Sequence, residues 1–361
     1  MKSNPFLRLG LPENPVILAP LAGVSDHPFR RICQLLGADL SYVEMISAAA
    51  LVYYSKKTLN MLHRHNLESI LGVQVTARHS EEMAKGIDIL NTYPFDTIDI
   101  NMGCPVRKVV KSGGGSAILK DPERVYRTTK VACQHTDKPI SVKIRLGWDH
   151  HLLTYHEVAK AAQEGGAQWL TVHGRTRNDT YQKPVDLAKI AEIKAALDIP
   201  VIGNGNIFSK EDADIMKKKT QVDGLMISRG ALGNPWIFRE VKGKHITTNL
   251  DDWLQIVAQH ISWQSEAYGD QGIGTVCMRK HLLWYVSGWP HARKVREKIN
   301  EMQSLARMKA ILVHYVQQLR DRDVYSRSIY SQSHRNDTRF LWNPVRDMNR
   351  YADRGVGEDG L

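Results

Sequence analysis

The stretch that decides the fold is Thr97-Ile98-Asp99-Ile100-Asn101-Met102-Gly103-Cys104-Pro105. Its first four residues form an apolar, β-leaning run that predicts a buried strand, and the glycine and proline that follow predict a loop. Cys104 is therefore expected at the end of a strand and near solvent, which suits a proton donor. Free cysteines are more often buried and inert, so a purely structural role stays open at this point.

Seven more short β-like runs are spaced along the chain, which makes eight in total. Most of them are apolar throughout rather than alternating, as expected for parallel strands that are covered on both faces. The seven runs are Val16–Ala19, Leu40–Glu44, Leu71–Val75, Ile140–Ile144, Trp169–Val172, Ile199–Ile202 and Gly224–Ile227.

The segments between these runs carry helix signals. Cap residues or first-turn acids and prolines occur in Asp26–Leu36, Ser80–Leu90, Asp121–Glu123 and Ser209–Asp212. Eight β/α units within residues 1–240 predict an α/β fold of the TIM (β/α)8 barrel class. The alternative is a doubly wound open sheet. That fold usually has a glycine-rich nucleotide fingerprint after its first strand, whereas Ala19-Pro20-Leu21-Ala22-Gly23 stands there.

The strand pattern stops after residue 240. Helices are predicted over Leu250–Tyr268, Gly274–Val286 and Ala292–Leu319. We therefore expect a barrel domain over residues 1–240 and a small helical domain over residues 241–325. Residues 326–361 are polar, irregular and rich in Arg, Asp and Asn, which predicts a flexible tail.

Composition limits the partners of the chain. It has 361 residues and a formal net charge of +11, which favours a polyanionic partner. Its first residues lack the apolar core of a secretory signal, and no apolar run approaches the ~20 residues of a membrane span. The four cysteines show no CxxC spacing, so neither a disulfide framework nor a metal site is predicted. We expect a cytoplasmic monomer that binds no membrane and no metal.

The active site of a TIM barrel is built from the C-terminal ends of its strands. Lys143 lies in the fifth predicted strand. An ammonium group is expensive to bury there unless it meets an anion such as a phosphate or a reduced flavin ring. A structural ion pair with Asp99 or Glu44 is the alternative. Arg145, two residues further on, is expected to point toward the mouth of the barrel.

Other strand ends carry polar residues as well. Gln74 needs a hydrogen-bond partner, which a cofactor edge or a neighbouring backbone would supply. His173 suits a hydrogen bond to a cofactor or substrate carbonyl and Arg175 suits a phosphate, although a lone histidine is more often just a satisfied polar group. Glycines and amides end the last two strands in Gly203–Asn206 and Ser228–Gly233. Together these two loops predict a phosphate site built from backbone N–H groups.

A long basic loop, Val106–Ser116, follows Cys104. It does not match the GxxxxGK[ST] pattern, so a nucleoside-triphosphate loop is not predicted. A mobile flap that closes over a substrate and a plain surface loop with solvated lysines both stay open.

Taken together, these residues resemble the tRNA-dihydrouridine synthases, and the bacterial B-type branch most closely, over residues 10–325. The resemblance rests on ordered motifs in both predicted domains. The motifs are Ala19–Asp26, Asp99–Pro105, Val142–Trp148, Val172–Thr176, Gly233–Phe238, Arg279–His281 and Trp284–Tyr285.

The resemblance implies a TIM barrel that binds FMN and a helical domain that helps to hold tRNA. It implies reduction of the C5–C6 double bond of particular uridines, with NADPH (or NADH) as reductant and Cys104 as proton donor to C5. The implied flavin contacts are Pro20, Leu21, Ala22, Gln74, Lys143, His173, Asn204, Gly205, Asn206, Ser228 and Arg229. The residues implied to face the uridine and its backbone are Asn101, Arg145 and Arg175.

Three positions depart from the usual pattern of this family. Leu21 stands where Met is common, Asn206 where an acid is common, and Ser228 where Gly is common. Leu21 is close to Met in size, and the other two keep hydrogen-bonding groups. The departures therefore bear on the details of flavin contact.

Basic residues gather in the predicted helical domain, where residues 279–298 hold six Lys or Arg and one Glu. Such a run is usually a solvated face, but a barrel that acts on tRNA needs a neighbour that binds phosphates. The residues expected to contact tRNA are Arg279, Lys280, Arg293, Lys294 and Arg296. A rival reading, an FMN barrel for a small molecule, leaves these charges unexplained. A non-catalytic RNA-binding protein leaves Cys104, Lys143 and His173 unexplained.

Overall fold

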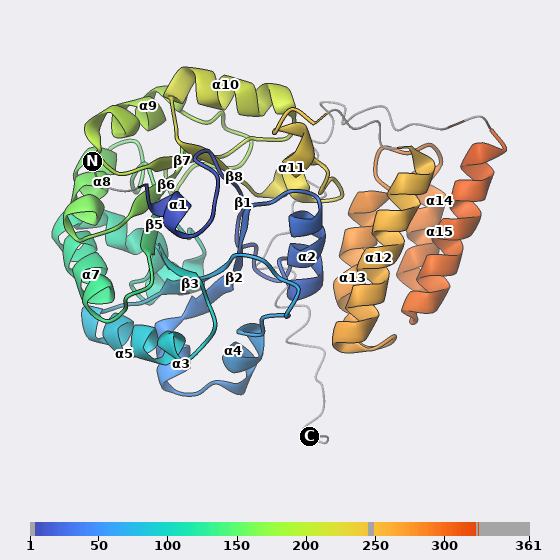
Figure 1. The fold of residues 1–361 in the computed structure, drawn as a ribbon, viewed down its shortest axis with the longest axis horizontal. Helices are drawn as coiled ribbons and strands as arrows, with labels where there is room; N and C mark the ends of the chain where they lie inside the picture. Colours follow the sequence, from blue (N-terminus) through green and yellow to red (C-terminus); the bar gives the residue numbers. More distant parts are fainter. Residues whose placement is uncertain (1–3, 245–248, 323, 325–361) are drawn as a thin grey trace.

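The computed structural model describes residues 4–244, 249–322 and 324. Eight parallel strands close into a barrel in the order of the chain, with β8 paired back to β1 (Figure 1). This confirms the predicted TIM barrel, and each predicted run overlaps one strand. The strands are β1 (Val16–Leu18), β2 (Leu40–Ser47), β3 (Leu71–Thr76), β4 (Thr97–Asn101), β5 (Ile140–Arg145), β6 (Trp169–His173), β7 (Val201–Asn204) and β8 (Gly224–Ile227).

The register of neighbouring strands brings polar positions to one level. Asn101 on β4 pairs with Lys143 on β5. Arg145 pairs with His173 on β6, which in turn pairs with Asn204 on β7. Four of these five residues are the last of their strands, so they lie at the C-terminal rim, where this fold builds its active sites.

Helices cover the outside of the barrel, and three of them begin at predicted cap residues. Side-chain oxygens of Asp26, Asp121 and Ser209 accept backbone N–H groups at the starts of α2, α7 and α10, which satisfies donors that a helix start leaves unpaired. The bounds are α1 (Pro5–Arg8), α2 (His27–Leu35), α3 (Ala48–Val52), α4 (Lys56–Met61), α5 (Ser80–Asn91), α6 (Arg107–Lys111), η1 (Gly115–Lys120), α7 (Pro122–Gln134), α8 (Tyr155–Glu164), α9 (Leu187–Ala196), α10 (Lys210–Thr220), η2 (Arg229–Ala231) and α11 (Ile237–Glu240).

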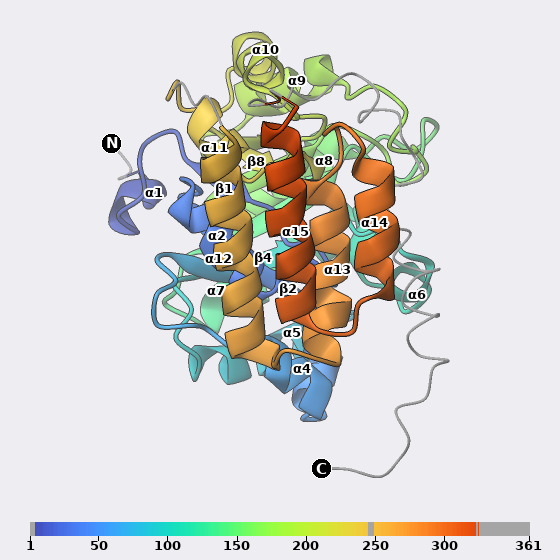
Figure 2. The ribbon, with the colours of Figure 1, turned by 90° about the vertical axis from the view of Figure 1, so that its right-hand side faces the viewer.

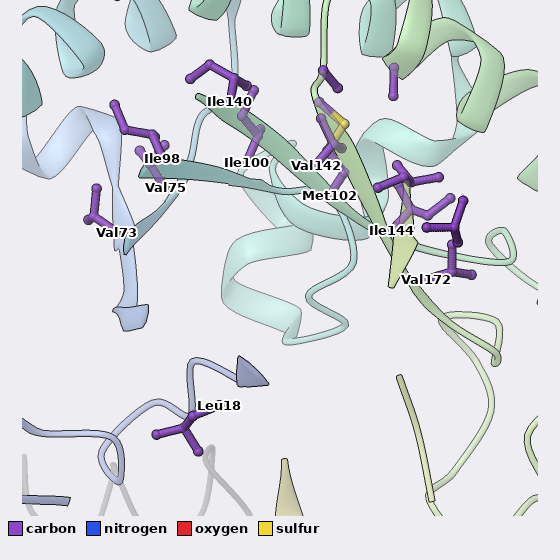
Figure 3. Packing of buried hydrophobic residues seen from close by; sticks show 14 of the residues in the cluster. Leu18, Val73, Val75, Ile98, Ile100, Met102, Ile140, Val142, Ile144 and Val172 are labelled. Atoms are coloured by element: carbon purple, nitrogen blue, oxygen red, sulfur yellow. The ribbon is translucent and has the colours of Figure 1, made fainter. Parts of the chain in front are cut away.

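In β4 and β5 apolar residues alternate with polar ones, and the apolar side chains form a buried core with the helices. Figure 3 shows part of this cluster, in which Ile98, Ile100, Val142, Ile144 and Val172 are fully buried. Burying a side chain of this kind stabilises the fold by about 1.5–3 kcal/mol. The alternate positions are thereby left to face the barrel interior.

A second apolar cluster fills the N-terminal end of the barrel. Phe6 on α1 packs against Trp169 with ring centroids 5.5 Å apart, and Ile17, Tyr42 and Met226 join them. The barrel interior is therefore apolar at this end and polar at the other, which leaves the C-terminal end for the site.

Four helices follow the barrel and lie side by side next to α2 and α11, as Figure 2 shows. They are α12 (Leu250–Tyr268), α13 (Ile273–Tyr285), α14 (Ala292–Glu301) and α15 (Leu305–Arg320). Ile32 and Leu36 from the α2 segment share a buried cluster with Trp253, Leu282 and Leu312. The helical domain is therefore joined to the barrel by apolar packing.

The prediction of one helix over Ala292–Leu319 is wrong, because the chain breaks it between α14 and α15. Ser304 caps α15 by accepting the N–H of Arg307 at 3.4 Å. Its hydroxyl also donates to the carboxylate of Asp270 at 2.6 Å, and the backbone N–H of Leu305 donates to the carbonyl of Asp270 at 2.9 Å. A long-range partner therefore fixes the break, and local periodicity does not reveal it.

Among the described helices, none has both the length and the apolar character that crossing a bilayer requires. The predicted tail, residues 326–361, lies outside the described residues.

Candidate active site

A polar network fills the C-terminal end of the barrel interior, with Asp99 at its centre. The Asp99 carboxylate accepts hydrogen bonds from Gln74 Nε2 at 2.7 Å and from Ser141 Oγ at 2.6 Å. Asn101 Nδ2 donates to Gln74 Oε1 at 2.8 Å. Burial raises the pKa of the Asp99 carboxyl. Gln74 is therefore held by two side-chain partners, which fixes the direction of its amide within the third strand.

The other end of the Asn101 amide holds the cysteine loop. Asn101 Oδ1 accepts the backbone N–H groups of Gly103 at 3.2 Å and of Cys104 at 2.9 Å. Arg145 is buried beneath the loop and donates from Nε to the carbonyl of Gly103 at 2.9 Å. Asn101 and Arg145 thus clamp the backbone on either side of Gly103, and Cys104 is half-buried at the rim.

The environment of Cys104 favours the thiol over the thiolate. Burial raises its pKa, and the positive charges of Arg145 and Lys143 only partly oppose this effect. An ordinary cysteine has a pKa of about 8.5, so a cysteine with a raised value is protonated at neutral pH. The group is suited to giving a proton rather than to nucleophilic attack.

The loop after Cys104 is more ordered than the sequence indicates. It contains α6, and Ser116 donates from both its backbone N–H and its hydroxyl to the carbonyl of Cys104, at 3.0 and 2.9 Å. Gly115 has a φ of 55°, and a Cβ placed there would lie 2.7 Å from the Cys104 carbonyl oxygen. The glycines of this loop therefore let it pack directly against the cysteine.

Lys143 reaches across the barrel to β7. Its Nζ donates to Asn204 Oδ1 at 3.0 Å, and Asn204 is oriented by its own donation to the Met226 carbonyl at 2.7 Å. In the described part of the chain no carboxylate lies within 4.0 Å of Lys143 Nζ, so the contact ion pair with Asp99 or Glu44 is not formed. Burial and the nearby Arg145 lower the pKa of Lys143. An anion beside the Lys143 ammonium would offset both the burial and the repulsion from Arg145.

The buried guanidinium group of Arg175 and the half-buried one of Arg229 meet at the ends of β6, β7 and β8. Arg175 Nη2 and Arg229 Nη2 both donate to Asn206 Oδ1, at 2.9 and 3.4 Å. Burial and the charge of Arg229 lower the pKa of Arg175 to about 10. Within residues 4–244 and 249–322, neither arginine forms an ion pair with a carboxylate. Two cations that share one neutral amide make an anion site.

The backbone beside this pair turns sharply at the end of β7. Gly205 has a φ of 120°, which favours glycine, and Asn206 has a φ of 53°. A Cβ on Gly205 would lie 3.0 Å from the His173 ring. Burial of the His173 ring and the nearby charge of Arg145 hold its pKa well below the ordinary value, so the ring is neutral.

The loop after β1 forms the opposite wall. It is a tight turn in which the N–H of Leu21 donates to Ser25 Oγ at 2.8 Å, while Pro20, Leu21 and Ala22 stay partly exposed. The N–H of Gly23 donates to the Glu44 carboxylate. Small side chains and a turned backbone leave room for a flat ring against this wall.

The structure brings most of the predicted site residues together and assigns two of them different neighbours. Arg175 lies with Arg229 and Asn206, so its guanidinium fits the phosphate that its strand-end position suggests, rather than the uridine contact that the family resemblance implies. Ser228 accepts from Asn204 Nδ2 at 3.2 Å and so supports the partner of Lys143. These contacts depend on side-chain direction, which a strand-end motif does not encode.

Tyr181 is a site residue that the sequence did not reveal. Its ring lies under the Arg229 guanidinium at 4.3 Å, and its carbonyl accepts from Arg175 Nη2 at 3.0 Å. It belongs to an irregular segment between β6 and α9, and no motif or periodicity marks it.

The five basic residues predicted to contact tRNA fall into two groups. Arg279 donates to the Met302 carbonyl at 2.8 Å and Lys280 donates to the Gly23 carbonyl, so both are engaged inside the protein. The other three are on α14. Arg293 has a side chain 88% exposed, Lys294 is exposed, and Arg296 is half-buried.

The fold and this geometry define a class: a TIM-barrel enzyme with a cluster of arginines at the ends of its last three strands and a protonated cysteine at its rim. The chain belongs to the dihydrouridine synthase (Dus) family, whose family model matches residues 17–320.

Similar proteins are found in several bacteria. The tRNA-dihydrouridine synthase B of Pasteurella multocida is 38% identical over 282 residues, which is 76% of this chain and 85% of that protein. The protein of the same name from Shewanella oneidensis is 34% identical over 313 residues, 85% of this chain and 97% of its own length. A solved structure of the old yellow enzyme homologue from Zymomonas mobilis aligns with a TM-score of 0.47 and 12% identity, over 64% of this chain and 89% of that one.

Proposed function

We propose that this protein is an FMN-dependent tRNA-dihydrouridine synthase. It reduces the C5–C6 double bond of uridines in tRNA and takes its electrons from NADPH or NADH. The observation that carries the proposal is the half-buried thiol of Cys104, which the Asn101 and Arg145 clamp holds at the barrel rim in its protonated form. Membership of the dihydrouridine synthase family supports the same conclusion.

The residues present fit FMN at both ends of the cofactor. Arg175 and Arg229, with the turn at Gly205–Asn206 beside them, would bind the phosphate. The Lys143 ammonium, whose hydrogen bond goes to the neutral amide of Asn204, would lie against the ring. When bound and reduced, FMN would supply a hydride for C6 of the uracil.

The chain itself supplies the proton and the orientation. Cys104 Sγ gives its proton to C5, because a thiol with a raised pKa is available as an acid at neutral pH. Arg145 and Asn101 keep the loop in place through backbone contacts, so the thiol does not need to move to reach the base. The ammonium group of Lys143 would place a positive charge beside the flavin ring, from which the electrons leave.

The tRNA must offer its uridine turned out of the stack, because the reacting atoms lie inside the barrel mouth. Binding energy for this step comes from phosphate contacts. Figure 2 places α14 toward the same side as α6, which follows Cys104, and away from α1 at the closed end. Arg293, Lys294 and Arg296 on α14 are therefore the proposed phosphate contacts of the helical domain.

The decisive test is restoration of dihydrouridine in tRNA isolated from a strain that lacks the modification, with purified protein and NADPH. We expect yellow protein that oxidises NADPH and produces dihydrouridine at defined positions. A yellow protein that oxidises NADPH and leaves tRNA unchanged would favour a small-molecule substrate. A colourless protein that binds tRNA would favour a non-catalytic RNA-binding role.

Cys33, Cys104, Cys133 and Cys277 are free, which fits the cytoplasmic location favoured by the sequence. A monomer stays a prediction.

A further inference from the structure

Two neighbouring tyrosines stand out on the surface of the barrel. Tyr53 and Tyr54 lie in the turn between α3 and α4, and they are 80% and 69% exposed. Tyr53 is the most exposed large hydrophobic side chain in the described part of the chain. Single exposed apolar residues are ordinary, but adjacent exposed aromatic rings are typical of binding surfaces.

The turn holds the tyrosine pair in a defined conformation. The N–H of Tyr54 donates to the Leu51 carbonyl at 2.8 Å, and the N–H of Ser55 donates to the Ala50 carbonyl at 2.9 Å. Tyr54 has a φ of 51°, a region that side chains other than glycine rarely adopt. The backbone therefore turns sharply at the two tyrosines, and their rings project to the surface instead of packing in the core.

The pair belongs to the same end of the barrel as the candidate active site. α3 begins directly after β2 ends at Ser47, and α5 begins soon after β3 ends at Thr76. A cavity of about 210 Å³ lies between the two helices. Tyr53 forms part of its wall, together with His79 and Lys85. The same wall also carries the carboxylates of Glu81 and Glu82. A hollow with an aromatic edge is thus present on the rim from which the substrate must approach.

The charge around the pair suits a polyanion. Lys56 and Lys57 follow Tyr54 directly and are exposed, and Lys85 lines the cavity. Arg78 donates to Glu82 at 2.9 Å, so that acid is already neutralised. Glu81 remains as the other carboxylate of the cavity wall, and the three lysines outnumber it. Aromatic rings beside lysines are typical of sites that bind unpaired nucleotides. Any base can stack on an aromatic ring while the neighbouring phosphate contacts a lysine.

We propose that Tyr53 and Tyr54 form a stacking platform for unpaired tRNA bases near the uridine that enters the barrel, with Lys56 and Lys57 on the adjoining phosphates. The proposal rests on the proposed function, since it takes tRNA as the partner. It adds a second tRNA contact on the barrel rim, separate from α14.

The test compares Tyr53→Ser/Tyr54→Ser with Tyr53→Phe/Tyr54→Phe. Stacking of one base is worth about 1–3 kcal/mol, so the Ser variant should raise KM for tRNA at least about tenfold. The Phe variant keeps both ring faces and should stay near wild type. NADPH oxidation without tRNA should be the same in all three proteins. Leu7→Ser is the matched control, because Leu7 is 55% exposed on α1 at the closed end of the barrel.

A second measurement is independent of turnover. Ultraviolet crosslinking of tRNA that carries 4-thiouridine, mapped by mass spectrometry, should label the peptide that contains Tyr53. If the Ser variant keeps the wild-type KM and the label falls elsewhere, the platform is overturned and the surface is left for a protein partner. Loss of tRNA affinity in the Phe variant would also overturn it, because the hydroxyls would then be responsible. Bound FMN and Tm are checked first, and the single variants replace the double one if it fails to fold.

The two proposals fail separately. A wild-type protein that forms no dihydrouridine overturns the proposed function. A wild-type protein that forms it, alongside a Ser variant with unchanged KM, overturns the platform alone.

Discussion

The ammonium group of Lys280 donates a hydrogen bond to the carbonyl oxygen of Gly23. Lys280 is on α13 of the helical domain, and Gly23 is in the loop after β1 that forms one wall of the proposed flavin site. The N–H of the same glycine donates to Glu44, so both sides of this residue are held. A Cβ on Gly233 would lie 2.4 Å from the Trp284 carbonyl, so α13 also packs closely on the loop after β8. The helical domain therefore shapes the cofactor wall as well as offering a basic surface.

Lys280→Met should weaken FMN binding while leaving the fold intact. A hydrogen bond of this kind contributes about 0.5–1.5 kcal/mol, which corresponds to a roughly 2- to 10-fold higher Kd for FMN. Fluorescence titration of the flavin-free protein measures it. Arg279→Met is the matched control, since Arg279 donates to Met302 within the helical domain and should lower Tm without changing the Kd. Equal effects of the two variants on the Kd would show that Lys280 acts only through domain stability.

Cys104→Ala should retain FMN and lose most uridine reduction. General acid catalysis contributes typically 10²–10⁴-fold, so turnover with tRNA should fall by about that factor. The rate at which NADPH reduces the bound flavin should be unchanged, because the thiol acts in the other half of the cycle. Stopped-flow absorbance separates the two half-reactions. Full uridine reduction by the variant would remove Cys104 from the mechanism.

The pH dependence of turnover should follow the raised pKa of Cys104. The protonated thiol is the active form, so the rate is constant below that pKa and declines as pH rises through it. The alkaline limb should therefore lie above the ordinary cysteine value of about 8.5. In Cys104→Ser the limb that belongs to the thiol should disappear, because a hydroxyl does not ionise there. Only a decline from the lowered pKa of Lys143 should remain. A limb that falls at or below neutral pH would indicate a thiolate and contradict proton donation.

The strand pattern of the barrel is readable from the sequence because its physical cause is local. A parallel strand covered on both faces is apolar over several residues, and all eight such runs lie on strands. Asp26, Asp121 and Ser209 cap the expected helices for a similar reason, since a cap bonds an N–H three residues away. The break before Leu305 has no local cause, because Ser304 there bonds to Asp270, which lies 34 residues away.

The sequence predicts which residues of the site lie at the strand ends, but it does not predict the direction of their side chains. Motif position predicts that Lys143, Asn204 and Cys104 lie at one rim. In the structure Lys143 donates to Asn204, and Cys104 follows the end of β4. Whether Arg175 turns to the base or to the phosphate depends on Asn206 and Arg229, which belong to other β/α units. The contact between Lys280 and Gly23 spans 257 residues, so a basic run in the sequence alone suggested only a surface role.

Arg175→Met should weaken the binding of FMN and leave the binding of riboflavin nearly unchanged, because riboflavin lacks the phosphate. A hydrogen bond to a charged group contributes about 1.5–3 kcal/mol, so the Kd for FMN should rise roughly 10- to 100-fold. Titration of both flavins gives the ratio that decides the assignment. Equal losses for the two flavins would mean a structural role. An unchanged Kd with a higher KM for tRNA would return Arg175 to the uridine, as the family resemblance implies.

Neutralising α14 should flatten the salt dependence of tRNA binding. Arg293, Lys294 and Arg296 changed together to Gln remove three proposed phosphate contacts. Each contact contributes about 0.7–0.9 to the slope of log K against log salt, so the slope should fall by roughly 2. Filter binding over a series of salt concentrations measures it.

The control for α14 removes the same charge elsewhere. Lys217, Lys218 and Lys219 changed to Gln lie on α10, which Figure 1 places against the barrel and away from the four-helix domain. If only the α14 variant changes the slope, the helical domain holds the tRNA backbone. Equal slopes for the two variants would mean that net charge alone attracts the RNA, and an unchanged slope for α14 would refute its placement. A counterion is released only where a basic residue contacts a phosphate, and each release adds to the slope. The comparison of the two variants therefore distinguishes direct phosphate contacts from long-range attraction by the net charge of the protein.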